Sequence, residues 1–467
     1  MDSPRVRPSV RHRLLLLFVI VALHALSTNA TVTDSYQVVP VAQNIVHHGT
    51  IALGHAPAFG DQLPLNTEQH HGVLYPVFPW TVSLFVLPVV AVVDAAHGLG
   101  IVDHVPADWW IQVMAMSIVV GLTALVLETV ALQVMRRGRF RERLWLAALV
   151  ALVFAFSTSA WSTASRSAWQ HGPSMLCLTV GLWALLRSEY RAGTTAIAGA
   201  AFAAAYCVRP TNIITLGLVG VWLLARPRAA VPRFAAGAVA VLGPFVLVNL
   251  FNYRGLVPAY FRGNTFTGHA TVLTALAGNL VSPGRGLFLF NPVVLLAPIG
   301  LVIGIRRRAL REPFLVLAAA VVAQWLVISL FPKWWGGWSY GPRFFSDVIP
   351  FLLVLAVPAA AALFDSPRSG AKVGALTAAG ALVAAGFVVN AEGALMRSTL
   401  CWNLTPRAVD AQPSRVWSWS NPQLLAGLRG IADNGLRYEL ARGGAIGHDP
   451  TPDDGGVYGC RPFSTGT

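Results

Sequence analysis

The sequence consists mainly of long apolar runs separated by short connections that are rich in arginine. A helix needs about 20 apolar residues to cross a bilayer, and the mean hydropathy of +0.60 is high enough for many such helices. Charged residues make up 12% of the chain, whereas soluble domains contain about 25%. The expected spans are 13–28, 111–135, 144–160, 170–186, 193–208, 211–225, 234–251, 287–305, 313–331, 347–364 and 373–390. The predicted fold class is therefore an all-α polytopic membrane protein with 11 transmembrane helices.

The basic connections give these spans an orientation. Together with the N-terminal segment RVRPSVRHR, five of them hold more than half of the 34 Lys and Arg residues, at 136–143, 187–191, 225–233, 306–312 and 366–372. The positive-inside rule places all of them in the cytoplasm. We therefore expect a cell-membrane protein with a cytoplasmic N-terminus. The formal charge of +14 reflects this orientation, and nucleic acid is not an expected partner.

One further apolar stretch, VLYPVFPWTVSLFVLPVVAVV at 73–93, is also long enough to span. A span here would turn the arginines of 136–143 outward, against the positive-inside rule. The stretch contains Pro76, Pro79, Trp80 and Pro88, and Trp favours the depth of the lipid headgroups. We expect it to lie along the outer interface or to re-enter the membrane. The alternative is that it spans and a neighbouring run does not.

This topology divides the chain into a transmembrane domain, 1–390, and an extracytoplasmic tail, 391–467. The first extracytoplasmic loop is 29–110 and should contain interfacial helices. Cys401 and Cys460 lie in the tail, where an oxidising compartment would allow a disulfide. The sequence leaves open whether that bond forms.

Several cations lie on the predicted outer face, where the orientation rule disfavours them. Arg209, Arg285, Lys333 and Arg343 are the candidates for binding a phosphate, because arginine offers a planar fork of donors to it. The competing interpretation is that each side chain extends to lipid headgroups. The neighbouring Trp334 and Trp335 could stack on a sugar or belong to an interfacial aromatic belt.

Asp34 is the first carboxylate after the first span, just before Val38, Val41, Ala42, Ile45 and Val46 recur at helical spacing. It could act at the membrane surface, cap this helix, or do both. Glu68 lies close to two histidines in NTEQHHGVLYP, but that spacing is not diagnostic of a metal site, and no metal ligands are assigned.

The order of several motifs resembles the GT-C superfamily of membrane glycosyltransferases, which includes protein O-mannosyltransferases and the lipid A aminoarabinose transferase. DSYQVVPVAQNIVHHGTIAL resembles the acidic motif and interfacial helix of the family's first outer loop, and GVLYPVFPW resembles its surface stretch. AAAYCVRPTNII resembles a recurring turn of the family, and SPGRGLFLFNPV and WWGGWSYGPRFFSDVIPFL resemble segments of bacterial members. The similarity extends over most of residues 10–390.

The resemblance implies an inverting transfer of a hexosyl or pentosyl group from a polyprenyl-phosphate donor to a hydroxyl of a glycan, lipid or protein. Asp34 would be the catalytic base, and Arg209, Arg285, Lys333 and Arg343 would bind the donor phosphate. The expected substrate-binding residues are Tyr36, Glu68, His171, Trp334, Trp335 and Tyr340. No cofactor is certain, although a divalent cation is possible. Many relatives carry a second acid at the position that Ser35 occupies here. A metal bound by that second acid is therefore doubtful in this chain.

Two other function classes compete with the glycosyltransferase. A transporter or flippase for a lipid-linked anion is expected to show internal repeats and broken helices near the midplane, and the sequence shows no repeat. A polymerase or ligase of lipid-linked glycans would also use outer arginines, but without the early acid.

Overall fold

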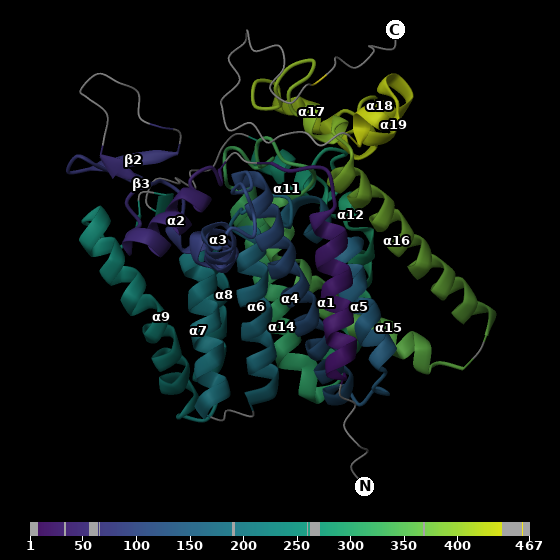
Figure 1. Cartoon of the computed structure of the whole chain (residues 1–467). Helices are drawn as coiled ribbons and strands as arrows, with labels where there is room; N and C mark the ends of the chain where they lie inside the picture. Colours follow the sequence, from purple (N-terminus) through teal and green to yellow (C-terminus); the bar gives the residue numbers. More distant parts are fainter. Residues whose placement is uncertain are drawn as a thin grey trace.

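The computed structural model describes residues 8–31, 34–55, 64, 66–188, 192–258, 260–261, 271–367, 369–440 and 460. These residues form a helical bundle with a cap at one end (Figure 1). The helices of the bundle are α1 (Val10–Ala25), α4 (Asp108–Arg137), α5 (Leu144–Phe156), α6 (His171–Ser188), α7 (Ala192–Val208), α8 (Ile213–Leu224), α9 (Ala230–Tyr253), α13 (Leu296–Ile305), α14 (Arg308–Ser329), α15 (Ile349–Asp365) and α16 (Gly370–Leu395). Among the described residues, 6 helical segments are long and apolar enough to cross a membrane, and shorter apolar helices accompany them. The chain is therefore a mostly helical, multi-pass membrane protein.

The cap holds α2 (Val38–His48), a small sheet, α3 (Ser83–Gly98), α11 (Val272–Val281) and the C-terminal helices. Figure 1 shows α3 nearly end-on, so this helix runs across the bundle axis, while α1 begins at the end of the bundle opposite the cap. Length and composition alone would allow Trp80–Gly98 to span. The crossing direction of α3 instead fits the interfacial position expected for 73–93.

The cap also contains strands, which an all-α prediction omits. β1 (Gly54–His55), β2 (Thr67–His70) and β3 (Val73–Pro76) form an antiparallel sheet in the order β1-β3-β2. His71 and Gly72, between β2 and β3, have φ of 51° and 80°. Two consecutive positive φ values are typical of the two-residue turn that closes a β-hairpin. The hairpin carries the first part of 73–93 away from the membrane-spanning direction.

Small residues set the closest helix contacts in the bundle. A Cβ on Gly199 of α7 would come within 1.9 Å of the carbonyl oxygen of Phe234 in α9, and one on Gly237 equally close to that of Ala196. A Cβ on Gly300 of α13 would lie 2.0 Å from the carbonyl oxygen of Leu355 in α15. Helices in membranes pack closely where such residues let backbones approach.

The expected span 287–305 is interrupted in the structure. It consists of α12 (Leu287–Phe290), a 3-10 turn at Pro292–Leu295, and α13. Pro292 has no N–H to continue the helix, and the Val294 N–H donates to the Asn291 carbonyl rather than to that of Phe290. The side chain of Asn390 donates a hydrogen bond to the Phe290 carbonyl at 2.8 Å. The break is thus stabilised by a polar side chain from α16.

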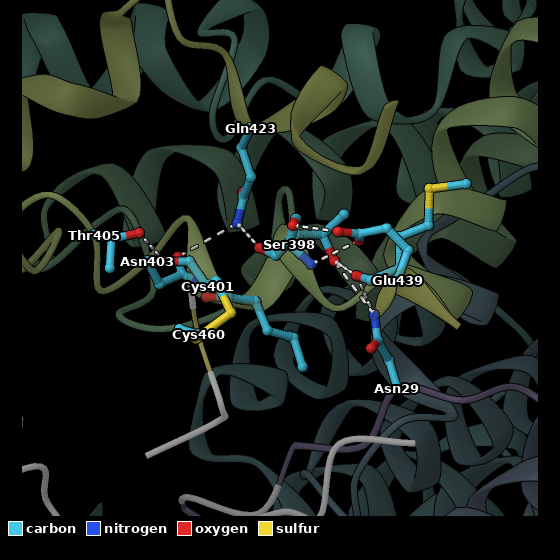
Figure 2. The surroundings of a disulfide bond; sticks show 11 residues. Asn29, Ser398, Cys401, Asn403, Thr405, Gln423, Glu439 and Cys460 are labelled. Atoms are coloured by element: carbon cyan, nitrogen blue, oxygen red, sulfur yellow. Dashed lines mark hydrogen bonds between the residues drawn. A yellow bond between two sulfur atoms is a disulfide. The ribbon is translucent and has the colours of Figure 1, made fainter. Parts of the chain in front are cut away.

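The described part of the tail contains α17 (Ser398–Cys401), α18 (Ala426–Asn434) and α19 (Leu436–Glu439) and lies on the end of α16. The disulfide between Cys401 and Cys460, left open by the sequence, is formed, with Cα atoms 5.5 Å apart. Figure 2 shows that Asn29, which follows α1, reaches this region. Its side-chain amide donates to the Met396 carbonyl at 2.7 Å. The tail therefore contacts the segment that leads to Asp34.

Candidate functional site

Asp34 and Arg343 meet at the capped end of the bundle. Asp34 lies in the turn before α2, and Arg343 begins the 3-10 segment Arg343–Val348 that leads into α15. The Asp34 Oδ2 atom is 2.9 Å from the Arg343 Nη1 atom, and the two side chains are 37% and 13% exposed. This ion pair therefore remains accessible from a narrow cavity of about 40 Å³ that both residues line.

The turn that carries Asp34 is held by polar contacts to the segment before α6. The hydroxyls of Ser35 and Ser167 are 2.6 Å apart, and Gln112 Nε2 donates to the Ser35 carbonyl at 3.3 Å. Arg166, which is buried, donates to the carbonyl of Asn29 at 3.3 Å. These contacts fix the backbone on either side of the carboxylate.

Arg343 is held by aromatic rings on one side. Its guanidinium carbon lies 4.7 Å from the ring centroid of Trp169 and 5.3 Å from that of Phe344. Such cation–π contacts stabilise an arginine without using its N–H donors. Within the described residues the buried Nε of Arg343 has no hydrogen-bond partner. Position 341, two residues before Arg343, requires glycine, because its φ is 64° and a Cβ there would lie only 2.6 Å from the Phe290 ring.

Arg209, His171 and Asp347 form a buried cluster on the adjoining wall. Arg209, in the turn after α7, forms an ion pair with Asp347. The Nδ1 atom of His171, the first residue of α6, is 3.0 Å from Asp347 Oδ1 and 2.9 Å from Arg209 Nη1. Burial lowers the pKa of Arg209 to about 9, so this residue still carries a positive charge at neutral pH. His171 and Arg209 line the same cavity as Asp34.

Arg285 lies elsewhere, beneath the tail. It donates to the carbonyls of Trp335, Gly284 and Gly337 at 2.5, 2.7 and 2.9 Å. It also donates to Asn403 Oδ1 at 2.9 Å and to the side-chain oxygen of Gln423. Arginine has five N–H donors, and all five are used by these protein acceptors. Burial lowers the pKa of Arg285 to about 9.

Lys333 and the two tryptophans also belong to the tail contact. The Lys333 Nζ atom is 3.3 Å from Asp410 Oδ2 on an exposed surface. Trp335 donates to Asp410 Oδ1 at 2.7 Å. Trp334 packs against Gly278 of α11. The structure therefore does not bring these three residues into the cavity with Asp34.

The remaining predicted substrate residues are dispersed. Tyr36 is exposed at 37% and does not line the cavity. Glu68, on β2, is 3.3 Å from His70, two residues from Asn66, which does line the cavity. Tyr340 is buried, and its hydroxyl donates to the Val389 carbonyl at 2.7 Å.

The cavity also contains residues that the sequence reasoning did not place there. Trp169, Tyr260 and Phe344 line it, and Asp347 supports it from behind. Asp347 lies four residues after Arg343 in the same 3-10 segment, and this closeness in sequence is a signal that could have associated it with the site. Among the described residues, no group of three or more His, Cys, Asp or Glu side chains is arranged to hold a metal ion.

The fold defines a class: the structure has the fold of solved GT-C membrane glycosyltransferases. The expected resemblance to that superfamily is thereby confirmed at the level of the fold. No protein-family model matches the sequence, and the search of curated proteins finds no match.

Two of the solved structures that the chain resembles come from different enzymes. One is the archaeal oligosaccharyltransferase AglB from Archaeoglobus fulgidus, in complex with an inhibitory peptide and a dolichol-phosphate. The TM-score is 0.51 at 14% identity, over 88% of this chain and 60% of AglB, so the chain spans less than two thirds of that enzyme. The other is ArnT from Cupriavidus metallidurans in the apo state, with a TM-score of 0.50 at 17% identity, over 84% of this chain and 69% of ArnT.

Proposed function

We propose that the chain is an integral-membrane glycosyltransferase that moves a sugar from a polyprenyl-phosphate donor to a hydroxyl acceptor with inversion. One observation carries the proposal: a carboxylate, Asp34, and two cations, Arg209 and Arg343, line a single cavity at one end of the bundle. A proton acceptor and a phosphate-binding pair are the groups that this reaction needs. The shared fold with AglB, whose structure contains a dolichol-phosphate, supports the donor class.

The donor phosphate would bind between the two arginines. Arg343 has a buried Nε without a protein partner among the described residues, so it can donate to a phosphate oxygen. A second cavity, of about 70 Å³, shares Arg209, Tyr260 and Phe344 with the first and is also lined by Ile328 and Phe331. Its apolar wall offers a place for the first part of the polyprenyl chain next to the phosphate site.

The chemistry would be a single displacement at the anomeric carbon. Asp34 accepts the proton of the acceptor hydroxyl as its oxygen bonds to the anomeric carbon. The bond from that carbon to the phosphate oxygen breaks, and the phosphate leaves with the electron pair. Arg343 and Arg209 would stabilise the charge that develops on it, an effect worth several kcal/mol in a water-poor site. Binding of phosphate would also draw Arg343 from Asp34 and leave the carboxylate free as the base.

We further propose eleven spans, a cytoplasmic N-terminus and an extracytoplasmic site in the cell membrane. Residues 1–390 would form the transmembrane domain, with 29–110 as the first extracytoplasmic loop and 391–467 as the extracytoplasmic tail. The disulfide in the tail supports this orientation, because disulfides persist in oxidising compartments. The acceptor would be a glycan, lipid or protein on that side.

The test is to incubate membranes that contain the overproduced protein, and that supply hydroxyl acceptors, with radiolabelled undecaprenyl-phosphate sugars, one at a time. We expect one of them to release its sugar, and Asp34→Asn to lower that rate by about 100-fold or more, the usual contribution of a general base. Binding of undecaprenyl phosphate should persist in this variant. Asp103→Asn, a matched change on an exposed loop, should be neutral. Wild-type turnover by Asp34→Asn would exclude the proposed base.

A further inference from the structure

A large cavity lies at the end of the bundle opposite the proposed active site. Its volume is about 950 Å³, at the upper end of the range for small-molecule sites. It is lined by the last turns of α6, by α8, by the first half of α14, and by the connections that follow α4 and α13. These chain segments belong to the end of the bundle where α1 begins (Figure 1). The proposed glycosyl transfer does not use this cavity.

The mouth of the cavity is strongly basic. Glu312 is the only acid among the residues that line the cavity. Six arginines line it: Arg137, Arg139, Arg226, Arg306, Arg307 and Arg308. Arg226 forms an ion pair with Glu312 and stacks on Trp222 at 4.8 Å. Arg139, Arg306 and Arg308 are exposed and have no carboxylate partner within the described residues. The mouth therefore carries an excess of positive charge that the described chain does not neutralise.

The interior of the cavity is apolar. Leu182 and Leu186 of α6, Phe202 of α7, Val219 of α8 and Leu317 of α14 form its walls. The positive-inside rule accounts for arginines in the connections, but it does not require a deep apolar cavity beneath them. The combination of a cationic mouth and an apolar interior matches a ligand that has an anionic head and hydrocarbon chains.

We propose that this cavity binds an anionic phospholipid from the leaflet at that end of the bundle. The phosphate would lie among Arg139, Arg306 and Arg308, and an acyl chain would occupy the apolar interior. Basic pockets between membrane helices are known to bind anionic lipid headgroups in this way. A free phosphate would use the arginines alone and would leave the interior without a ligand. The site is separate from the one proposed for the polyprenyl-phosphate donor.

The experiment is native mass spectrometry of the delipidated full-length protein, titrated with phosphatidylglycerol or with phosphatidylcholine of the same chain length. We expect phosphatidylglycerol to bind at least about tenfold more tightly, since each arginine near an anionic lipid contributes substantially to binding. Inorganic phosphate, added as a competitor, should not displace the bound lipid. Equal affinity for the two lipids, or complete displacement by phosphate, would overturn the proposal.

Two kinds of variant separate the head and chain sites. Arg306→Gln combined with Arg308→Gln should weaken phosphatidylglycerol binding about tenfold or more. Arg228→Gln is the matched control, because this exposed arginine lies in the same connection as Arg226 but does not line the cavity. Ala320→Phe, which fills the apolar interior, should weaken binding while leaving the arginines in place. If the double variant binds as tightly as Arg228→Gln, or Ala320→Phe as tightly as wild type, the cavity is not the lipid site.

Discussion

At the scale of single residues, Arg343 connects the two halves of the proposed reaction. One of its nitrogens contacts the carboxylate of Asp34 at 2.9 Å, while its Nε remains without a described partner. Two aromatic rings hold the guanidinium plane in place. The residue can therefore exchange a carboxylate for a phosphate without losing its position. This exchange would couple binding of the donor to release of the base.

Replacement of Arg343 should affect the donor more than the fold. We expect Arg343→Ala to weaken binding of undecaprenyl phosphate about tenfold or more, because a hydrogen bond to a charged group contributes about 1.5–3 kcal/mol. Binding can be measured by native mass spectrometry. Lys333→Ala was expected from the sequence to act in the same way. Since Lys333 instead contacts Asp410, it should leave donor affinity unchanged, and a similar loss in both variants would contradict the proposed phosphate site.

The sequence indicated part of this site and not the rest, for a physical reason. Arg343 could be identified because a cation on the predicted outer face conflicts with the orientation rule, whereas the role of Asp34 was implied by the resemblance of its segment to the first outer loop of the GT-C superfamily. Arg285 showed the same conflict, yet its five donors are satisfied by acceptors of the tail and neighbouring loops. Whether an outer arginine is free or internally paired depends on contacts between distant segments. No site role could be predicted for Asp347, because its partners, His171 and Arg209, are more than 100 residues away.

At the scale of elements, the tail contributes to the bundle through Arg285. We expect Arg285→Ala to lower the free energy of unfolding by more than about 3 kcal/mol, because several buried acceptors lose their donor at once. The measurements are thermal unfolding and limited proteolysis, in which cleavage after residue 391 should become faster. Lys333→Ala, at an exposed ion pair, is the control and should change stability by less than about 1 kcal/mol. Equal stability of the two variants would show that Arg285 does not anchor the tail.

A second contact within the tail, between Glu439 and Ser398, should make the stability of the protein depend on pH. Its carboxylate accepts hydrogen bonds from the Ser398 amide at 3.0 Å and hydroxyl at 2.5 Å. Burial raises the pKa of Glu439 above its ordinary value of 4.5. The folded state therefore holds the proton more tightly than the unfolded state does. The stabilising contribution is complete below pH 4.5 and is lost as pH rises through the raised pKa.

The measurement is the melting temperature as a function of pH for the wild type and Glu439→Gln. The wild type should lose stability relative to the variant as pH rises from 4.5. Arg228→Gln, an exposed change far from the tail, should follow the wild type. Parallel curves for the wild type and Glu439→Gln would show that this carboxyl does not titrate between the folded and unfolded states.

The elements themselves were largely predictable where hydropathy alone decides them. The expected span 111–135 corresponds to α4 at Asp108–Arg137, and 193–208 to α7 at Ala192–Val208. The span expected at 287–305 is divided because Asn390, from a distant helix, stabilises the break. The hairpin of β2 and β3 depends on two positive φ values at His71 and Gly72, which apolar periodicity does not report.

At the scale of the whole molecule, the two ends of the bundle differ in structure. The capped end has a narrow cavity in which each arginine faces a carboxylate. The opposite end has a wide cavity with apolar side chains in its walls and a cationic mouth whose charge the described residues do not neutralise. A lipid-linked donor at one end and an anionic lipid at the other would both favour one orientation in the membrane. Their positions therefore make the orientation testable independently of activity.

That orientation can be measured with single cysteines. The two free native cysteines, Cys177 and Cys207, are buried, so they should give little background with an impermeant thiol reagent. In intact cells we expect Trp419→Cys, at a tail position that is 63% exposed, to be labelled. Arg228→Cys, on an exposed connection at the other end, should be labelled only after the membrane is permeabilised. Gly138 is less suitable, because a Cβ there would lie 2.5 Å from the Phe140 ring. The reverse labelling pattern would place the proposed active site in the cytoplasm, where the disulfide of the tail and the arginine-rich connections would both contradict the usual rules.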